Sequence, residues 1–214
     1  MSDLPVILIG AGSHAKVLID ALQCAGCNIL FALDSTPEKT GTTLLGVSIL
    51  GDETMLADHS PKDTKLVNGV GSAQSCAARR DVYLRLKSQG WRFAQVIHPS
   101  AIIAKSATLG EGAQILAGAV VQPLCSVGDN AIINTRASID HDCRIGAHAH
   151  IAPGSALSGG VHIGEATHIG VGCSVIQNIR IGSGTLIGAG SVVVKNVPDG
   201  VVAYGVPAKV IRKV

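Results

Sequence analysis

The sequence predicts two domains: a small Rossmann-like βαβ domain over residues 1–97 and a parallel β-helix of hexapeptide repeats over residues 98–214. An aliphatic residue at every sixth position of the second half predicts the β-helix, because neither an α-helix nor a simple strand has that period. No Phe, Tyr or Trp occurs between Phe93 and Tyr204, which agrees with a tube too narrow for rings. Alternating strand-like and helix-like segments predict the α/β domain.

The first half is expected to contain a small parallel sheet with helices between its strands. Short apolar runs indicate strands, and segments whose apolar residues return every three or four positions indicate helices. In chain order we expect a strand at 5–9, a helix at 14–25, strands at 28–33 and 65–70, a helix at 75–89 and a strand at 91–97. This alternation is typical of parallel α/β domains.

A glycine-rich turn joins the first strand to the first helix. Residues 10–15 have the spacing G-x-G-x-x-A, and Asp34 ends the next strand, as in dinucleotide-binding folds. Glycines let the backbone approach a diphosphate, and the helix N-terminus supplies free amides. The domain is too short for a second mononucleotide half, so we expect a nucleotide diphosphate other than NAD. A tight turn without a ligand is the alternative.

The β-helix begins after the step His98-Pro99 and keeps its register to the end of the repeat. The aliphatic positions are Ile103, Leu109, Ile115, Val121, Val127, Ile133, Ile139, Ile145, Ile151, Leu157, Ile163, Ile169, Val175, Ile181, Ile187 and Val193. The residue four positions further on is small in most repeats, with Val161 and Ile179 as exceptions. We expect the aliphatic side chain to fill the tube and the small residue to fit its corner.

Composition excludes several classes of protein. The net charge of +2 is too close to zero to indicate nucleic acid or an anionic membrane as a partner. No run approaches the roughly 18 apolar residues that cross a bilayer, and the N-terminus lacks a basic signal region. We therefore expect a cytoplasmic protein.

The six cysteines are expected to be reduced and structural. Cys125, Cys143 and Cys173 occupy the small position of the repeat, where they act as compact apolar fillers. Cys24 and Cys27 have the spacing of half a zinc site, but no second pair or histidine follows at ligand spacing. We therefore expect no metal.

The densest polar group of the repeat is Asp140-His141-Asp142. A histidine flanked by carboxylates is suited to act as a general base, because a carboxylate fixes the tautomer and stabilises the imidazolium. A solvated, salt-bridged corner is the alternative. The sequence leaves open whether Asp140 or Asp142 orients the ring.

The repeat and the C-terminal segment at residues 204–209, Tyr-Gly-Val-Pro-Ala-Lys, resemble the hexapeptide acyltransferases, whose coils are left-handed and take three hexapeptides each. With the βαβ domain in front, nearly the whole chain resembles the PglD/NeuD-like nucleotide-sugar N-acetyltransferases and sialic acid O-acetyltransferases. The resemblance implies a homotrimer with acetyl-CoA between neighbouring tubes. Aliphatic residues outside the inward register (Val120, Ile132, Leu186 and Val192) give mild support.

The resemblance also assigns roles to residues. His141 followed by Asp142 matches the family's catalytic pair. The sugar-nucleotide contacts it implies are Gly12, Ser13, His14, Asp34 and Ser35, with Ser35 standing where relatives can carry a second acid. The acetyl-CoA contacts are His150, Val171 and Ala189, and Gly160 leaves room for the thioester arm on the coil above His141. For His162 and His168 we expect an exposed face of the tube.

The activity implied is acetyl-CoA-dependent N-acetylation of a nucleotide-linked 4-amino-4,6-dideoxy sugar, with GDP-perosamine favoured. No cysteine adjoins a histidine in the catalytic segment, so direct transfer is expected rather than an acyl-enzyme. A UDP-linked 4-amino sugar and a sialic acid are alternative acceptors in the same fold. A non-catalytic nucleotide-binding scaffold is the alternative from a different class.

Overall fold

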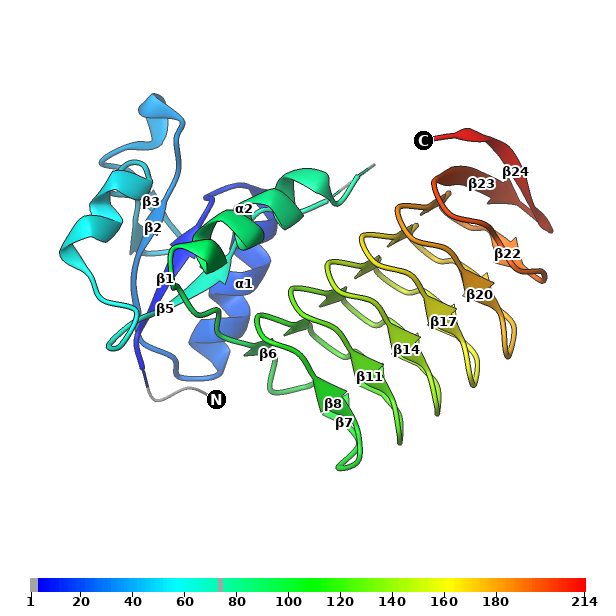
Figure 1. Cartoon of the computed structure of the whole chain (residues 1–214). Helices are drawn as coiled ribbons and strands as arrows, with labels where there is room; N and C mark the ends of the chain where they lie inside the picture. Colours follow the sequence, from blue (N-terminus) through cyan, green and yellow to red (C-terminus); the bar gives the residue numbers. More distant parts are fainter. Residues whose placement is uncertain (1–3, 73–74) are drawn as a thin grey trace.

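The computed structural model describes residues 4–72 and 75–214, and it shows an α/β domain seated at one end of a coiled tube (Figure 1). The tube is a left-handed parallel β-helix, so the predicted fold class is confirmed. Within these ranges, no helix has both the length and the apolar character needed to cross a bilayer.

The α/β domain is built on a three-stranded parallel sheet in the order β2-β1-β5. Its main elements are β1 (Val6–Ile9), α1 (Ser13–Cys24), β2 (Ile29–Leu33), β5 (Lys65–Asn68) and α2 (Ala77–Ser88). Successive strand residues point to opposite faces, so Val6 and Leu8 pack with α1 whereas Ile7 and Ile9 pack with α2. These elements lie within two residues of their predicted bounds.

Between β2 and β5 the chain forms short elements that the sequence did not predict. They are η1 (Pro37–Lys39), β3 (Thr43–Leu44), β4 (Val47–Ser48) and η2 (Glu53–Asp58). The side chain of Asp52 caps η2 by accepting a hydrogen bond from the Thr54 amide (2.9 Å). Backbone hydrogen bonds from Leu50 to Ala32 and from Asp34 to Gly51 hold the segment before η2 beside the carboxyl end of β2.

The β-helix has three sheets, one for each side of the coil. The docked sheet, which faces the α/β domain, contains β6 (Val96–Ile97), β9 (Gln114–Ile115), β12 (Ile132–Ile133), β15 (His150–Ile151), β18 (His168–Ile169), β21 (Leu186–Ile187), β23 (Val201–Gly205) and the antiparallel β24 (Ala208–Lys213). The second sheet contains β7 (Ile102–Ile103), β10 (Val120–Val121), β13 (Ser138–Ile139), β16 (Ala156–Leu157), β19 (Ser174–Val175) and β22 (Val192–Val193). The third contains β8 (Thr108–Leu109), β11 (Ser126–Val127), β14 (Arg144–Ile145), β17 (His162–Ile163) and β20 (Arg180–Ile181).

The coil length follows from the strand register. Val120 pairs with Ser138 and Ile132 with His150, so each turn takes eighteen residues, or three hexapeptides. The aliphatic residue of each repeat points into the tube and joins one continuous core, as predicted. The third residue after it turns the corner with φ near +60°, as at Asp142 (60°) and Asn130 (54°).

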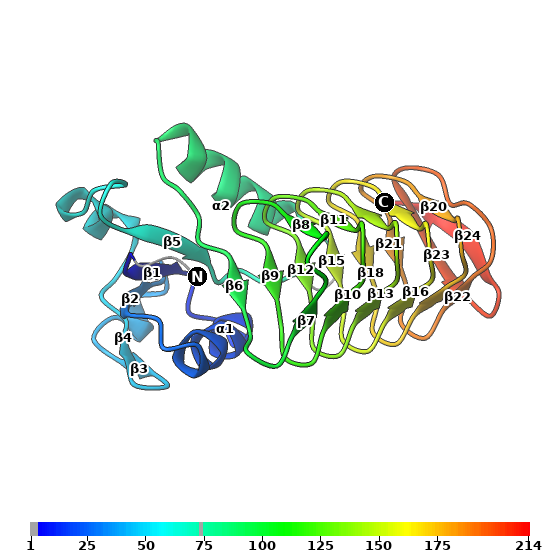
Figure 2. The ribbon, with the colours of Figure 1, turned by 90° about the horizontal axis from the view of Figure 1, so that it is seen from below.

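The α/β domain packs directly on the docked sheet, whose strands run side by side along the tube (Figure 2). Val96, Leu116 and Ile132 of the β-helix share a buried cluster with Leu18 and Leu22 of α1. Ile132 is therefore covered within the chain, which corrects the expectation that it is left free to pack against another tube. The strand expected at 91–97 is shorter. Only β6, at Val96–Ile97, is a strand, and it pairs with β9 of the β-helix, whereas Phe93 forms an isolated bridge with Leu66 of the α/β domain.

Candidate active site

The group Asp140-His141-Asp142 lies on the corner between the second and third sheets, immediately after β13. The Nδ1 atom of His141 lies 2.7 Å from Oδ2 of Asp142, while Oδ1 of Asp140 accepts a hydrogen bond from the His141 amide (2.7 Å). Asp142 therefore holds the ring and Asp140 holds the backbone. The carboxylate can only accept, so Nδ1 carries the proton and Nε2 presents its lone pair.

The electrostatics of this corner favour a basic imidazole. The hydrogen bond to Asp142 raises the pKa of His141, and the charge of Asp140 raises it further. The His141 side chain is 62% exposed, so a substrate can reach the ring. These properties suit a group that takes a proton near neutral pH.

A depression of about 600 Å³ surrounds the ring. Its floor comes from the next coil, where Gly159 lies so close that a β-carbon would be 2.6 Å from Nε2 of His141. Gly160 approaches Asn178 in the same way, with a β-carbon 2.5 Å from its Oδ1. Gly160 was expected to leave room for a ligand on this coil, whereas its neighbour Gly159 makes room for the His141 ring itself. Asn178 was missed, although the eighteen-residue spacing Asp142–Gly160–Asn178 could have found it.

The glycine turn of the α/β domain is held by Asp34. Its Oδ2 accepts hydrogen bonds from the Ala11 amide (2.8 Å) and from Lys39 Nζ (2.7 Å), and its Oδ1 accepts one from the Thr36 amide (3.0 Å). Burial opposes ionisation, but these hydrogen bonds outweigh it and lower the pKa of Asp34. Asp34 therefore fixes the shape of the turn through these three hydrogen bonds. A ribose contact, which the sequence also led us to expect, would be a second role.

The amides beyond that turn start α1 without a side-chain cap. Gly12 is the N-cap residue, and within residues 4–72 and 75–214 no side chain accepts a hydrogen bond there, so the first amides are available to an anion. Ser13 is exposed beside them. His14 is turned toward the β-helix, where its Nε2 lies 2.8 Å from Oε1 of Gln114, and burial lowers its pKa to about 4.

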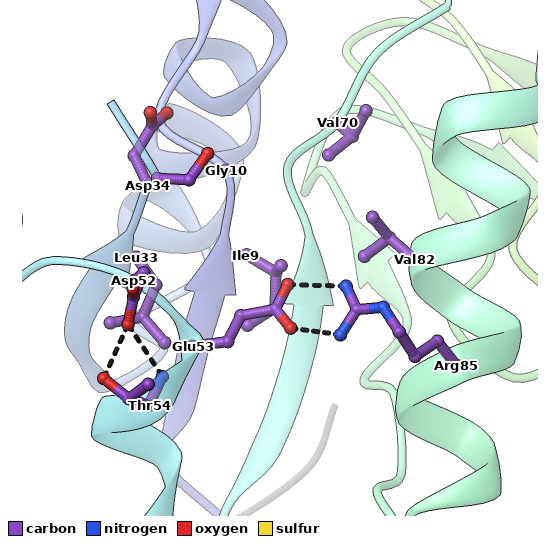
Figure 3. A pocket seen from close by; sticks show the side chains of 11 residues that line it. Ile9, Gly10, Leu33, Asp34, Asp52, Glu53, Thr54, Val70, Val82 and Arg85 are labelled. Carbon is purple, nitrogen blue, oxygen red and sulfur yellow. Dashed lines mark hydrogen bonds and ion pairs between the residues drawn. The ribbon is translucent and has the colours of Figure 1, made fainter. Parts of the chain in front are cut away.

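A pocket of about 530 Å³ opens next to the turn (Figure 3). Ile9, Leu33, Val70 and Val82 give it apolar walls. Its polar lining residues are Asp34, Ser35, Asp52, Glu53, Thr54 and Arg85. The Glu53–Arg85 ion pair joins η2 to α2, a contact between residues that the sequence analysis did not consider.

His150 lies under the α/β domain. Its Nδ1 is 2.6 Å from Oγ of Ser72, its Nε2 is 2.9 Å from Nδ2 of Asn134, and its ring centroid is 4.8 Å from that of His168. Burial, followed by the charges of His168 and His14, lowers the pKa of His150 to about 2. His168 is buried as well, which corrects the expectation of an exposed face. The α/β domain covers it.

The candidate cofactor residues fall into two places. Val171 and Ala189 are exposed on the corner between the docked and second sheets, one coil apart, on the same side of the tube as His150. Gly160 is on the His141 corner. In a three-sided coil, the corner between the second and third sheets lies opposite the docked sheet. One chain therefore places His141 and the glycine turn on opposite sides of the tube.

One further group has the chemistry of metal ligands. Asp20 and Cys24, one turn apart on α1, present ligand atoms within 4.8 Å of one another and of His98. The sequence indicated no histidine partner for Cys24, because His98 reaches it only through the packing of the two domains.

Comparison with known families and structures agrees with this geometry. The PglD N-terminal domain matches residues 5–86, and the bacterial transferase hexapeptide (six repeats) matches residues 124–159. Curated protein sequences give no significant match. These two families define a hexapeptide-repeat acyltransferase that carries a PglD-type domain in front of its β-helix.

Solved structures extend the likeness to the whole chain. The perosamine N-acetyltransferase PerB of Caulobacter crescentus, in complex with CoA and GDP-perosamine, is 39% identical with a TM-score of 0.89, and the match covers 98% of each chain. The acetyltransferase domain of PglB from Neisseria gonorrhoeae FA1090, in complex with acetyl coenzyme A, is 35% identical with a TM-score of 0.91, covering 98% of this chain and 100% of that one. WeeI from Acinetobacter baumannii AYE, at 23% identity, 97% and 100% coverage and a TM-score of 0.80, shares the fold. The chain belongs to the PglD-like family of nucleotide-sugar N-acetyltransferases.

Proposed function

We propose that the protein transfers the acetyl group of acetyl-CoA to the 4-amino group of GDP-perosamine, with His141 as general base and Asp142 as the residue that orients it. The observation that carries the proposal is the His141–Asp142 contact of 2.7 Å on an open corner, where 62% of the His141 side chain is exposed. It occurs in a chain 39% identical to an enzyme crystallised with CoA and GDP-perosamine. That enzyme has also been crystallised with both ligands as H141N and H141A variants, which share the residue number.

The chemistry requires a base and a positioned thioester. The acceptor amine is an ammonium in water, and it must lose a proton before its nitrogen attacks the thioester carbonyl. Nε2 of His141 takes this proton. The C–N bond then forms as the C–S bond breaks, and CoA leaves as the thiolate, which takes up the second proton lost by the attacking nitrogen. A thiol pKa of about 8.5 means that the leaving group needs little acid assistance. Holding the two substrates in line supplies much of the acceleration.

The buried cysteines do not compete for the role of nucleophile. Cys143, next to Asp142 on the same corner, points into the tube, and burial raises its pKa to about 12. A thiol with such a pKa is almost entirely protonated at neutral pH and is a poor nucleophile. Direct transfer to the amine is therefore favoured over an acyl-enzyme.

A second copy of the chain completes the site in this proposal. His141 lies opposite the docked sheet, whereas the glycine turn and Val171 lie along that sheet and its corner. A homotrimer that sets the His141 corner of one tube against the docked side of the next brings these groups together. Val120 and Val192, half-buried on the second sheet, supply apolar contacts for such packing.

The activity is tested by measuring CoA release with GDP- and UDP-linked 4-amino sugars and with a sialic acid. We expect the GDP-linked 4-amino sugar to give the highest kcat/KM, and His141→Asn to lower it by about 10²- to 10⁴-fold. Near-normal activity of His141→Asn would contradict the base assignment. Absence of CoA release with every acceptor would favour a nucleotide-binding scaffold.

The shared site is tested by complementation between two inactive variants. His141→Asn removes the base, and Ser13→Asp places a negative charge where the diphosphate would bind. Mixed oligomers combine an intact glycine turn from one chain with an intact His141 from another, so activity should return on co-expression. Activity that stays lost, or a monomer by light scattering, would show that each site belongs to one chain.

A further inference from the structure

The ion pair between Glu53 and Arg85 lies in the pocket next to the glycine turn (Figure 3). Arg85 comes from α2 and Glu53 from the first residue of η2, and both guanidinium nitrogens Nη1 and Nη2 donate to the carboxylate, with Nη2 to Oε1 at 2.9 Å. A two-point contact of this kind makes the carboxylate and the guanidinium coplanar. The pair thus presents a fixed row of acceptors and donors to the pocket.

The rest of the pocket fits a flat aromatic ring. Ile9 and Leu33 come from the sheet, and Val70 and Val82 come from the segment and helix opposite. Such walls suit the two faces of a nucleobase, whose hydrogen-bonding groups all lie on its edge. The ion pair lies beside these walls, where an edge would meet it.

The charges of the pocket determine which part of a nucleotide it accepts. Asp34, Asp52 and Glu53 line it, with Arg85 as the cation that lines it as well. Lys39 is already paired with Asp34 and Arg85 with Glu53, and Asp52 adds a further negative charge, so a diphosphate lies at the amides of α1 instead. The pocket is left for the ribose and the base.

On the basis of the proposed function, we propose that Glu53 and Arg85 recognise the base of the sugar nucleotide and select guanine. The Glu53 oxygen that faces the pocket keeps one lone pair that Arg85 does not use, and this lone pair accepts hydrogen bonds from both N1–H and N2–H of guanine. Arg85 donates to O6 from an outer N–H. Guanine has these two adjacent donors next to an acceptor, so its edge matches the order of groups in the pair.

Other bases fail at the carboxylate. Uracil has one N–H donor between two carbonyl oxygens, so one oxygen would face Glu53. Adenine would place the lone pair of N1 there. Each mismatch leaves an acceptor against a negative charge, whereas loss of the guanine amino group alone, as in inosine, removes one hydrogen bond without repulsion.

Binding to the wild-type protein tests the inference without any substitution. Calorimetric titrations with GDP, IDP, UDP and ADP, in the absence of acetyl-CoA, should show GDP bound about tenfold or more tightly than each of the others. UDP or IDP binding as tightly as GDP would overturn the inference. So would the absence of binding by all four.

Two variants test whether Glu53 and Arg85 cause the preference for GDP. Glu53→Gln keeps the shape of the side chain but loses the charge, so its GDP-to-IDP preference should fall to about threefold or less. Arg85→Gln should weaken GDP several-fold more than UDP. Arg80→Gln is the matched control, because Arg80 is a half-buried arginine on the same helix that lies outside the pocket and pairs with Asp81, and the variant should bind as the wild type does. An unchanged GDP-to-IDP ratio in Glu53→Gln would overturn the role of the carboxylate.

The outcomes separate this inference from the proposed function. A protein that prefers GDP but releases no CoA with amino sugars would retain the base selectivity and contradict the acetyltransferase activity. A protein that acetylates a UDP-linked sugar and binds UDP as tightly as GDP would retain the activity and contradict the selectivity.

Discussion

The ring of His141 lies against Gly159 of the next coil, where a β-carbon would come within 2.6 Å of both Cε1 and Nε2. A β-carbon essentially never lies this close to a non-bonded ring atom, so any larger residue at position 159 must move the ring. The position of the proposed base thus depends on a glycine eighteen residues away.

We expect Gly159→Ala to lower kcat/KM about 100-fold with little change in stability, because the displaced ring loses its place beside the acceptor amine. Steady-state kinetics and thermal unfolding check this. Gly184→Ala is the control: it also falls on a coil corner, with φ of +62° and open space around it, so it should cost stability and leave kcat/KM nearly unchanged. Equal activity in both variants would contradict the importance of the His141–Gly159 contact.

The pH–rate profile should report the ring's partner. The neutral imidazole is the active form and Asp142 raises the pKa of His141, so kcat/KM should rise with pH through a value above 6.5. Asparagine tolerates the left-handed backbone at position 142, so Asp142→Asn should keep the fold. It should shift the rise of kcat/KM to lower pH and lower the kcat/KM reached at high pH. Asp140→Asn should shift it less, since Asp140 binds the backbone amide. A larger shift in Asp140→Asn would reverse the two assignments.

Stability should fall as the pH drops below about 6.5. The unfolded chain protonates its histidines near that pH, whereas burial lowers the pKa of His14 to about 4 and that of His150 to about 2 in the folded protein. The unfolded state therefore binds more protons between pH 6.5 and 4, and each histidine can lower the unfolding free energy by up to about 1.4 kcal/mol per pH unit. Urea titrations at pH 7, 6 and 5 measure the slope. His150→Asn should flatten it more than His162→Asn, and an equal slope in both would contradict the role of burial.

Arg79 joins the two domains from a fully buried position. It donates to the carbonyls of Asn68 (2.8 Å), Val70 (2.8 Å) and Asn130 (3.1 Å), and among the described residues its Nη2 has no hydrogen-bond partner. Arg79→Met should lower the unfolding free energy by about 3 kcal/mol or more, because the carbonyls of Val70 and Asn130 lose this donor and that of Asn68 is left with its bond from Gln114 Nε2. The half-buried neighbour Arg80, which pairs with the exposed Asp81, gives the comparison: Arg80→Met should change the unfolding free energy by less than about 0.5 kcal/mol. Chemical denaturation of both variants decides the matter.

The proposed catalytic corner was predictable because it is local. His141 and Asp142 are neighbours, and the hexapeptide register places them on a corner rather than in the core. The resemblance to a known family assigned the pair a catalytic role. The eighteen-residue coil could have predicted that Asn178 lies near it. The choice between the two acids required coordinates, since it depends on whether each carboxylate reaches the ring or the backbone.

The nucleotide side of the site was predictable only in part. The spacing of residues 10–15 indicated the turn, and Asp34 was expected beside it. The partners of Asp34 and the Glu53–Arg85 pair come from segments whose short elements have no periodic pattern. Hydrophobic periodicity cannot place such segments, because their positions are set by caps and long-range hydrogen bonds.

The β-helix and its register follow from the six-residue period, because that period fixes which side chains point into the tube and which form its corners. Which of the three equivalent sides is covered depends on how the two domains pack. That choice buried His150, His168 and Ile132 and left His141 exposed on the opposite edge. All three sides carry the same period, so only the packing of α1 and α2 against one of them could distinguish it.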